Sequence, residues 1–176
     1  MNMNKKVPST AFVLSDGFEI DADLHTSKLN QFVNLVKLSE MSVTIGNELP
    51  IANATSDFDL YFIDCYQLAG DDAIPDDVMQ LALSANVVLF NCNHNAFCEK
   101  LAILAGIQGL FYRDNKADLV IKGLECIKKH ERWFKRSVMN LALSDLLKNH
   151  PERPQSNIKL AQPDAAMNNL TKREKT

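Results

Sequence analysis

Five short apolar runs restrict the fold of this chain more than any other feature of its sequence. They occupy residues 11–14, 42–45, 59–64, 86–91 and 109–113. Their length and their content of β-branched and aromatic residues are typical of buried strands. Segments with helical spacing follow at 22–38, 76–84, 95–105 and 116–130. Apolar strands that alternate with helices form parallel sheets covered on both faces, so we predict an α/β fold with five βα units.

Composition limits the number of domains and the classes of partner. With 176 residues, of which 46% are hydrophobic, the chain has room for one ordinary domain and a short appendage. Its net charge of -3 gives no general attraction to nucleic acid or to anionic lipid. Because no run of about 18 apolar residues and no signal-peptide core occurs, we expect a soluble, cytoplasmic protein without a membrane contact.

The four cysteines predict reduced thiols. They are Cys65, Cys92, Cys98 and Cys126, and no two of them form a CxxC pair. Cys92, His94 and Cys98 could be imagined as zinc ligands, but a fourth ligand at a recognisable spacing is missing. No phosphate-binding glycine loop and no nucleophile paired with a base occurs either, so we predict neither a zinc site nor an enzyme.

After the fifth unit the sequence predicts one more helix, over residues 133–148. Its apolar residues spread beyond one narrow stripe and include Val138, Met139, Leu141, Leu143, Leu146 and Leu147. Such a helix can pack on its own domain and still offer an apolar surface, so we expect it to form a homodimer contact. Residues 150–176 are polar and contain three prolines, as a linker does. We therefore divide the chain into a domain over 1–131, an extra helix over 132–149, and a linker.

Two acids at strand ends are similar to those of the response-regulator receiver domain. Asp16 follows the first strand and Asp64 ends the third, and functional groups of parallel sheets gather at that edge. The resemblance implies a flavodoxin-like (CheY-like) fold: a five-stranded parallel sheet with helices on both faces, here with a sixth helix added. In a receiver the residue at Asp64 accepts a phosphoryl group from a histidine kinase or a small phosphodonor. The residue at Asp16 helps to hold Mg²⁺.

Three neighbouring positions depart from the receiver pattern. Ser15 stands where receivers carry a second acid, Asn91 where they carry Ser or Thr, and Arg113 where they carry Lys. Losing one carboxylate weakens a Mg²⁺ site, and the other two residues would have to replace groups that grip the phosphoryl oxygens. Phosphorylation of Asp64 is therefore one hypothesis, and a retained strand-end acid without chemistry is the other.

Three segments resemble the VpsT- and CsgD-type biofilm regulators of the LuxR family. Residues 109–114 are similar to the fifth strand of those proteins. Trp133-Phe134-Lys135-Arg136 resembles the tetrapeptide W-[FLM]-[TS]-R, which in the VpsT type binds cyclic di-GMP. Residues 170–175, LTKREK, resemble the start of the LuxR-type helix-turn-helix. The resemblance implies a transcription regulator that contacts DNA only through a C-terminal domain, of which this sequence holds the first residues.

The chemistry of cyclic di-GMP explains why such a tetrapeptide could bind it. An indole stacks on a base, and arginine forms paired hydrogen bonds with guanine or phosphate. If residues 133–136 open a helix, Trp133 and Arg136 face the same side. Lys135 replaces a small hydroxyl residue; it adds positive charge and bulk. In the alternative interpretation, Trp133 and Phe134 only pack, while Arg132, Lys135 and Arg136 form a solvated face.

Three functions follow from these patterns. In the first, the domain binds cyclic di-GMP and dimerises through the extra helix. In the second, it is a phosphorelay receiver that uses Asp64 and Mg²⁺. In the third, it is a constitutive dimerisation domain that responds to neither signal.

Overall fold

The computed structural model describes residues 7–15, 22–50, 57–66, 73–94 and 99–149. Asp16, Cys98, the linker and the segment 170–175 lie outside the described residues. The thiols of the three described cysteines, Cys65, Cys92 and Cys126, are free. No described helix has both the length and the apolar character that a membrane span requires.

The five predicted strands form one parallel sheet. They are β1 (Thr10–Leu14), β2 (Ser42–Gly46), β3 (Leu60–Asp64), β4 (Val87–Cys92) and β5 (Gly109–Tyr112). Their spatial order is β2-β1-β3-β4-β5, with every neighbouring pair parallel. This is the flavodoxin-like order, in which functional groups collect beyond the carboxyl ends of the strands. The predicted fold class is confirmed.

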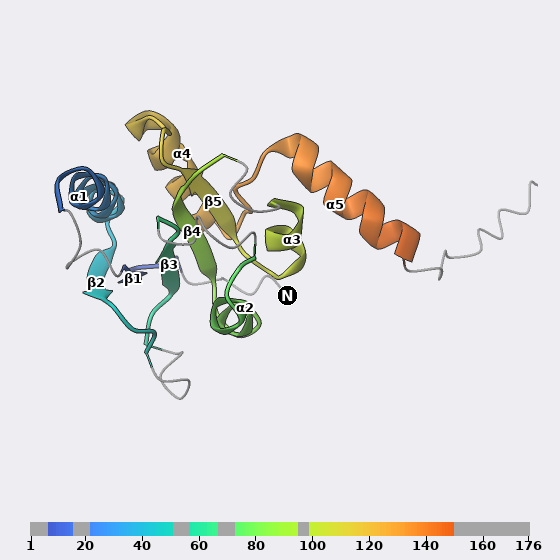
Figure 1. Cartoon of the computed structure of the whole chain (residues 1–176), viewed down its shortest axis with the longest axis horizontal. Coiled ribbons are helices and arrows are strands. Elements are labelled where there is room, and N and C mark those ends of the chain that lie inside the picture. The colour runs from blue at the N-terminus through green and yellow to red at the C-terminus, as the bar shows by residue number, and fades with distance from the viewer. Residues whose placement is uncertain (1–6, 16–21, 51–56, 67–72, 95–98, 150–176) are drawn as a thin grey trace, which may run out of the picture.

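The described helices are α1 (Ala22–Leu38), α2 (Asp76–Ala82), α3 (Glu99–Leu104), α4 (Ala117–Lys128) and α5 (Arg136–Asn149). The described residues between β2 and β3 contain no helix, so the extra C-terminal helix is labelled α5 in Figure 1. It packs mainly against α3 and extends away from the sheet.

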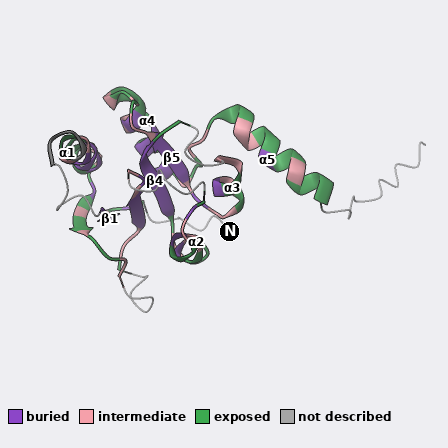
Figure 2. Ribbon diagram, in the orientation of Figure 1, coloured by how far each residue is buried: buried purple, intermediate pink, exposed green. Residues whose placement is uncertain are grey.

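Two apolar cores lie on the two faces of the sheet. One joins α1 and α4 to the sheet, where the ring of Phe32 stacks on that of Phe90 with centroids 4.1 Å apart. The other joins α2 and α3 to the opposite face through Val78, Leu81 and Ala102. Figure 2 shows the central strands buried and α5 largely exposed. The continuous apolar runs of the sequence thus correspond to strands covered on both faces.

The segment before α5 differs from the prediction. Trp133 forms an isolated parallel bridge with Gly109, and the helix begins at Arg136. The backbone N–H of Leu110 donates to the Trp133 carbonyl at 3.0 Å, and the Trp133 N–H donates to the Gln108 carbonyl at 3.0 Å. The expectation that residues 133–136 open a helix is therefore wrong. The open edge of β5 offers backbone partners that a helical first turn would leave unused.

Candidate functional site

The predicted strand-end residues meet around the carboxylate of Asp64. The Ser15 hydroxyl donates to Oδ2 at 2.8 Å. The Asn91 amide and the backbone N–H of Tyr66 donate to Oδ1 at 3.0 and 2.9 Å. Ser15 and Asn91 are buried. Three donors of the protein itself therefore occupy both oxygens of the residue that a receiver would phosphorylate.

A bulge in β4 directs Asn91 towards this carboxylate. The pairing register between β4 and β5 shifts between Leu89 and Cys92, and Asn91 adopts a φ of 59°. Asparagine is among the few residues that tolerate this left-handed conformation. Because of the bulge, Cys92 packs in the same core as Leu89, although simple alternation would place it on the other face.

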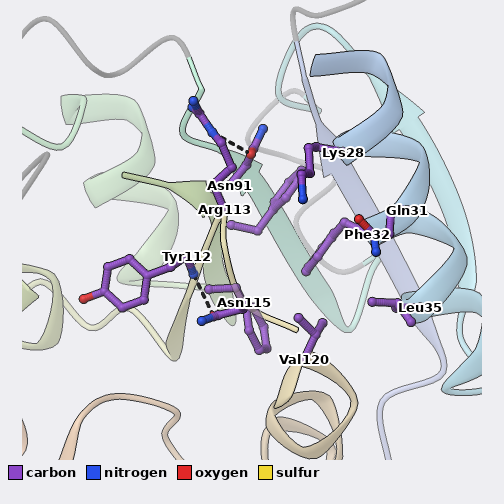
Figure 3. A pocket seen from close by; sticks show the side chains of 11 residues that line it. Lys28, Gln31, Phe32, Leu35, Asn91, Tyr112, Arg113, Asn115 and Val120 are labelled. Carbon is purple, nitrogen blue, oxygen red and sulfur yellow. Dashed lines mark hydrogen bonds between the residues drawn. The ribbon is translucent and has the colours of Figure 1, made fainter. Parts of the chain in front are cut away.

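Arg113 completes the cluster at its outer side. Its Nε donates to Asn91 Oδ1 at 3.2 Å, as Figure 3 shows, and its guanidinium lies 4.4 Å from the centre of the Tyr66 ring. Tyr66 was not among the predicted site residues. Its position two residues after the strand-end acid was the available signal, since a backbone N–H there can turn back to the carboxylate.

This donor set fits Mg²⁺ poorly. A magnesium site needs several oxygen ligands, mostly carboxylates and water. Here Ser15 points its hydroxyl proton at Asp64 and Asn91 directs an N–H to it, so both neighbours act as donors. Within the described segments no group of three or more His, Cys, Asp or Glu residues could hold a metal. The described donors therefore stabilise the Asp64 carboxylate, while Asp16, the other predicted Mg²⁺ ligand, lies outside the described residues.

The predicted ligand-binding tetrapeptide is divided between the two cores. The Trp133 ring lies 6.4 Å from the Phe111 ring and is half-buried, while Phe134 packs against the opposite core. Gly123 of α4 makes room for the indole, because a Cβ there would approach Trp133 Cε2 to 2.8 Å. Both aromatic residues therefore anchor the segment, and Trp133 does not share a helical face with Arg136.

Lys135 contacts Glu99, which begins α3, and Tyr112, which ends β5. Its Nζ lies 3.3 Å from Glu99 Oε1 and 4.6 Å from the centre of the Tyr112 ring. The Tyr112 hydroxyl donates to the same carboxylate oxygen of Glu99. Arg136, by contrast, is exposed and forms no ion pair with any residue in the described part of the chain. Glu99 and Tyr112 were not predicted, since only the tertiary fold brings them to Lys135.

A second aromatic contact extends this group. The His94 ring stacks on Tyr112 with centroids 4.0 Å apart, and its Nε2 lies 3.0 Å from Asp114 Oδ1. The hydrogen bond from His94 lowers the pKa of the Asp114 carboxyl. His94 therefore takes part in a surface hydrogen bond with Asp114, as a dispersed loop histidine without a catalytic role can.

Helix α3 is fastened to the 132–145 region at both of its ends. Arg132 donates to the Ile103 and Ile107 carbonyls at 3.2 and 3.0 Å, where α3 ends. Near its start, Lys100 lies 2.7 Å from Asp145 Oδ2 of α5. This contact with Lys100 lowers the pKa of the Asp145 carboxyl. Arg132 and Asp145 therefore attach α3 to the chain on either side of the tetrapeptide.

Helix α5 presents an apolar surface to solvent. Ala142 is its one buried residue, whereas four leucines are 43–66% exposed: Leu141, Leu143, Leu146 and Leu147. Figure 2 shows this helix exposed along most of its length. Exposed leucines of this kind can form a protein contact.

Residues 19–136 match the sequence model of the VpsT-like receiver domain. The chain belongs to the VpsT-like receiver-domain family. The match ends at Arg136, so the family domain includes the tetrapeptide. Comparison with curated protein sequences finds no significant match.

Two solved structures show that other regulators share the fold of this VpsT-like domain. One is the regulatory domain of the master biofilm regulator CsgD, with 14% identity, 77% of this chain and 98% of that chain covered, and a TM-score of 0.54. The other is a LuxR-family DNA-binding response regulator from Silicibacter pomeroyi. It has 19% identity, coverage of 73% and 98%, and a TM-score of 0.52. Both structures thus share the fold of the receiver domain that the family model identifies in this chain.

Proposed function

We propose that this VpsT-like receiver domain senses cyclic di-GMP at residues 133–136 and dimerises through α5. The observation that carries the proposal is the placement of Arg136. It is an exposed cation in the first turn of α5, beside an anchored aromatic pair and on the same helix as four exposed leucines.

The chemistry at Arg136 suits this ligand. Its guanidinium can pair with guanine O6 and N7 or with a phosphate, and it can stack on a base. The unpaired N–H groups at the start of a helix favour an anion at the same place. Since Trp133 is half-buried between Phe111 and Gly123, its role here is to position the segment. Arg136 then makes the main contact with the ligand.

In this proposal ligand binding and dimerisation are linked because both use α5. The ligand site lies at the first turn of α5, and the exposed leucines lie further along the same helix. A ligand that bridges two copies at Arg136 would bring the two leucine surfaces together. In a longer regulator, such a pair would place two DNA-binding domains on paired half-sites.

Calorimetry with cyclic di-GMP tests the site. The wild-type chain is expected to bind, and Arg136→Ala to weaken the affinity by about 10- to 100-fold, the range for a lost paired contact with guanine. Lys122→Ala is the matched control, since it removes an exposed cation of α4 that is not part of the tetrapeptide. Absence of binding heat in the wild type, or equal losses in both variants, contradicts the proposal.

Phosphorelay is the weaker alternative, because three internal donors already occupy the Asp64 oxygens. We expect no mass increase after incubation with acetyl phosphate and Mg²⁺. A gain of one phosphoryl group that Asp64→Asn prevents would favour the phosphorelay instead. A constitutive dimer is the remaining alternative, and it predicts a dimer mass that cyclic di-GMP leaves unchanged.

A further inference from the structure

A small pocket lies between α1 and the carboxyl ends of β4 and β5 (Figure 3). Its volume is about 30 Å³, room for about two water molecules. Part of its lining is apolar and includes Phe32 and Phe111. A cyclic dinucleotide is far too large for this space, whereas about two oxygens of a small oxyanion fit into it.

The polar lining of the pocket is positive. Lys28 of α1 and Arg113 after β5 contribute two cations, and none of the 11 lining residues is acidic. Lys28 makes no hydrogen bond or ion pair with any residue of the described segments. Arg113 uses its Nε on Asn91 and its face on Tyr66. Its terminal nitrogens form no hydrogen bond within the same described segments. Two positive charges thus share a partly apolar pocket, and no carboxylate among the described lining residues balances them.

We infer that this pocket binds a small dianionic oxyanion of the inorganic phosphate class between Lys28 and Arg113. A dianion balances the two unit charges, and the guanidinium fork matches tetrahedral oxygens. The Asn115 side-chain amide lies in the same lining, although its oxygen already accepts the Tyr112 N–H at 2.9 Å. Asp64 does not line the pocket. The anion is therefore held without a covalent bond, and this inference stands apart from the cyclic di-GMP proposal.

An NMR titration of the full chain with inorganic phosphate, at constant ionic strength, tests the site. Wild type is expected to show saturable shifts of the Asn91 and Arg113 backbone amides. Lys28→Gln should weaken phosphate binding about tenfold, the loss expected for one charge-assisted contact. Arg113→Gln should weaken it similarly, while Lys28→Arg retains it. Lys122→Gln, which removes an exposed cation of α4, serves as the control and should bind like wild type.

Further measurements separate a ligand site from a structural role. In phosphate-free buffer Lys28→Gln should keep the wild-type melting temperature, because Lys28 makes no internal bond among the described residues. Acetate, a monoanion, should bind several-fold more weakly than phosphate. Linear shifts without saturation, an unchanged phosphate affinity in Lys28→Gln, or equal affinities for acetate and phosphate would overturn the inference.

Discussion

The carboxylate cluster at Asp64 and the tetrapeptide at 133–136 both adjoin the sheet, the first at the end of β3 and the second beside β5. They differ in whether their charged side chains have partners within the fold. Asp64 accepts bonds from Ser15, Asn91 and the Tyr66 backbone. Arg136 is exposed, without an ion pair in the described chain. A charge whose partners lie within the fold serves stability, whereas a charge without internal partners is available to a ligand.

Under the proposed function, this difference explains how a receiver fold can lose one signal and use another. At the strand ends, replacement of an acid by Ser15 turns a neighbour that would repel Asp64 into one that donates to it. At the tetrapeptide, backbone pairing with β5 and the packing of Trp133 and Phe134 fix the segment without using Arg136. The fold thus stabilises one site internally and leaves the other open to an external anion.

The largest expected effect is a difference between the two regions in how much a substitution lowers the free energy of unfolding. Asp64→Ala should lower the free energy of unfolding by about 2–3 kcal/mol, because it leaves the buried donors of Ser15 and Asn91 without their acceptor. Arg136→Ala, which removes an exposed side chain, should change it by less than about 0.5 kcal/mol. Urea unfolding measures both values. Equal losses in the two variants would remove the distinction between the regions.

A smaller effect concerns the affinity for cyclic di-GMP. Glu99 holds Lys135 at 3.3 Å and competes with an anionic ligand for this cation. Glu99→Gln should therefore bind cyclic di-GMP a few-fold more tightly than wild type, by up to about 1 kcal/mol. Calorimetry on Glu99→Gln and on Glu125→Gln, an exposed acid of α4, measures the change. Weaker binding in Glu99→Gln would show that the Glu99 contact positions Lys135 for the ligand instead.

The smallest effect is a pH dependence of the contact between α3 and α5. The folded-state pKa of Asp145 is lowered below 3.8 by Lys100. A lowered folded pKa stabilises the fold above the unfolded value, and this contribution is lost as pH falls through the folded value. Amide exchange of α5 should therefore accelerate below about pH 3.8, after correction for intrinsic rates. Asp145→Asn should remove this pH dependence; its persistence in that variant would assign it to another group.

The sheet could be predicted from sequence because each strand is a local apolar run that needs no knowledge of its neighbours. The same is true of the strand-end positions Ser15, Asp64 and Asn91, which parallel pairing brings to one edge. The conformation at Trp133, by contrast, could not be predicted from the local sequence. Apolar spacing after residue 133 favoured a helix, but the free edge of β5 recruited the backbone at Trp133 into the sheet. That competition depends on an edge formed elsewhere in the chain.

The partners of the polar side chains could not be predicted from the sequence either. Lys135 looked like an additional cation for the ligand, whereas Glu99 and Tyr112 hold it from two other elements. The cationic pocket between Lys28 and Arg113 joins residues far apart in the sequence. Periodicity identifies buried faces, but it carries no information on which charged side chains meet across them.

Light scattering on the chain, without and with cyclic di-GMP, tests the central claim most directly. We predict that saturating ligand raises the solution mass from the 19.7 kDa of the monomer to twice that value. Arg136→Ala should stay monomeric at the same ligand concentration, while Lys122→Ala should dimerise like wild type. A mass that the ligand does not change, in a chain shown to be folded, would contradict the account.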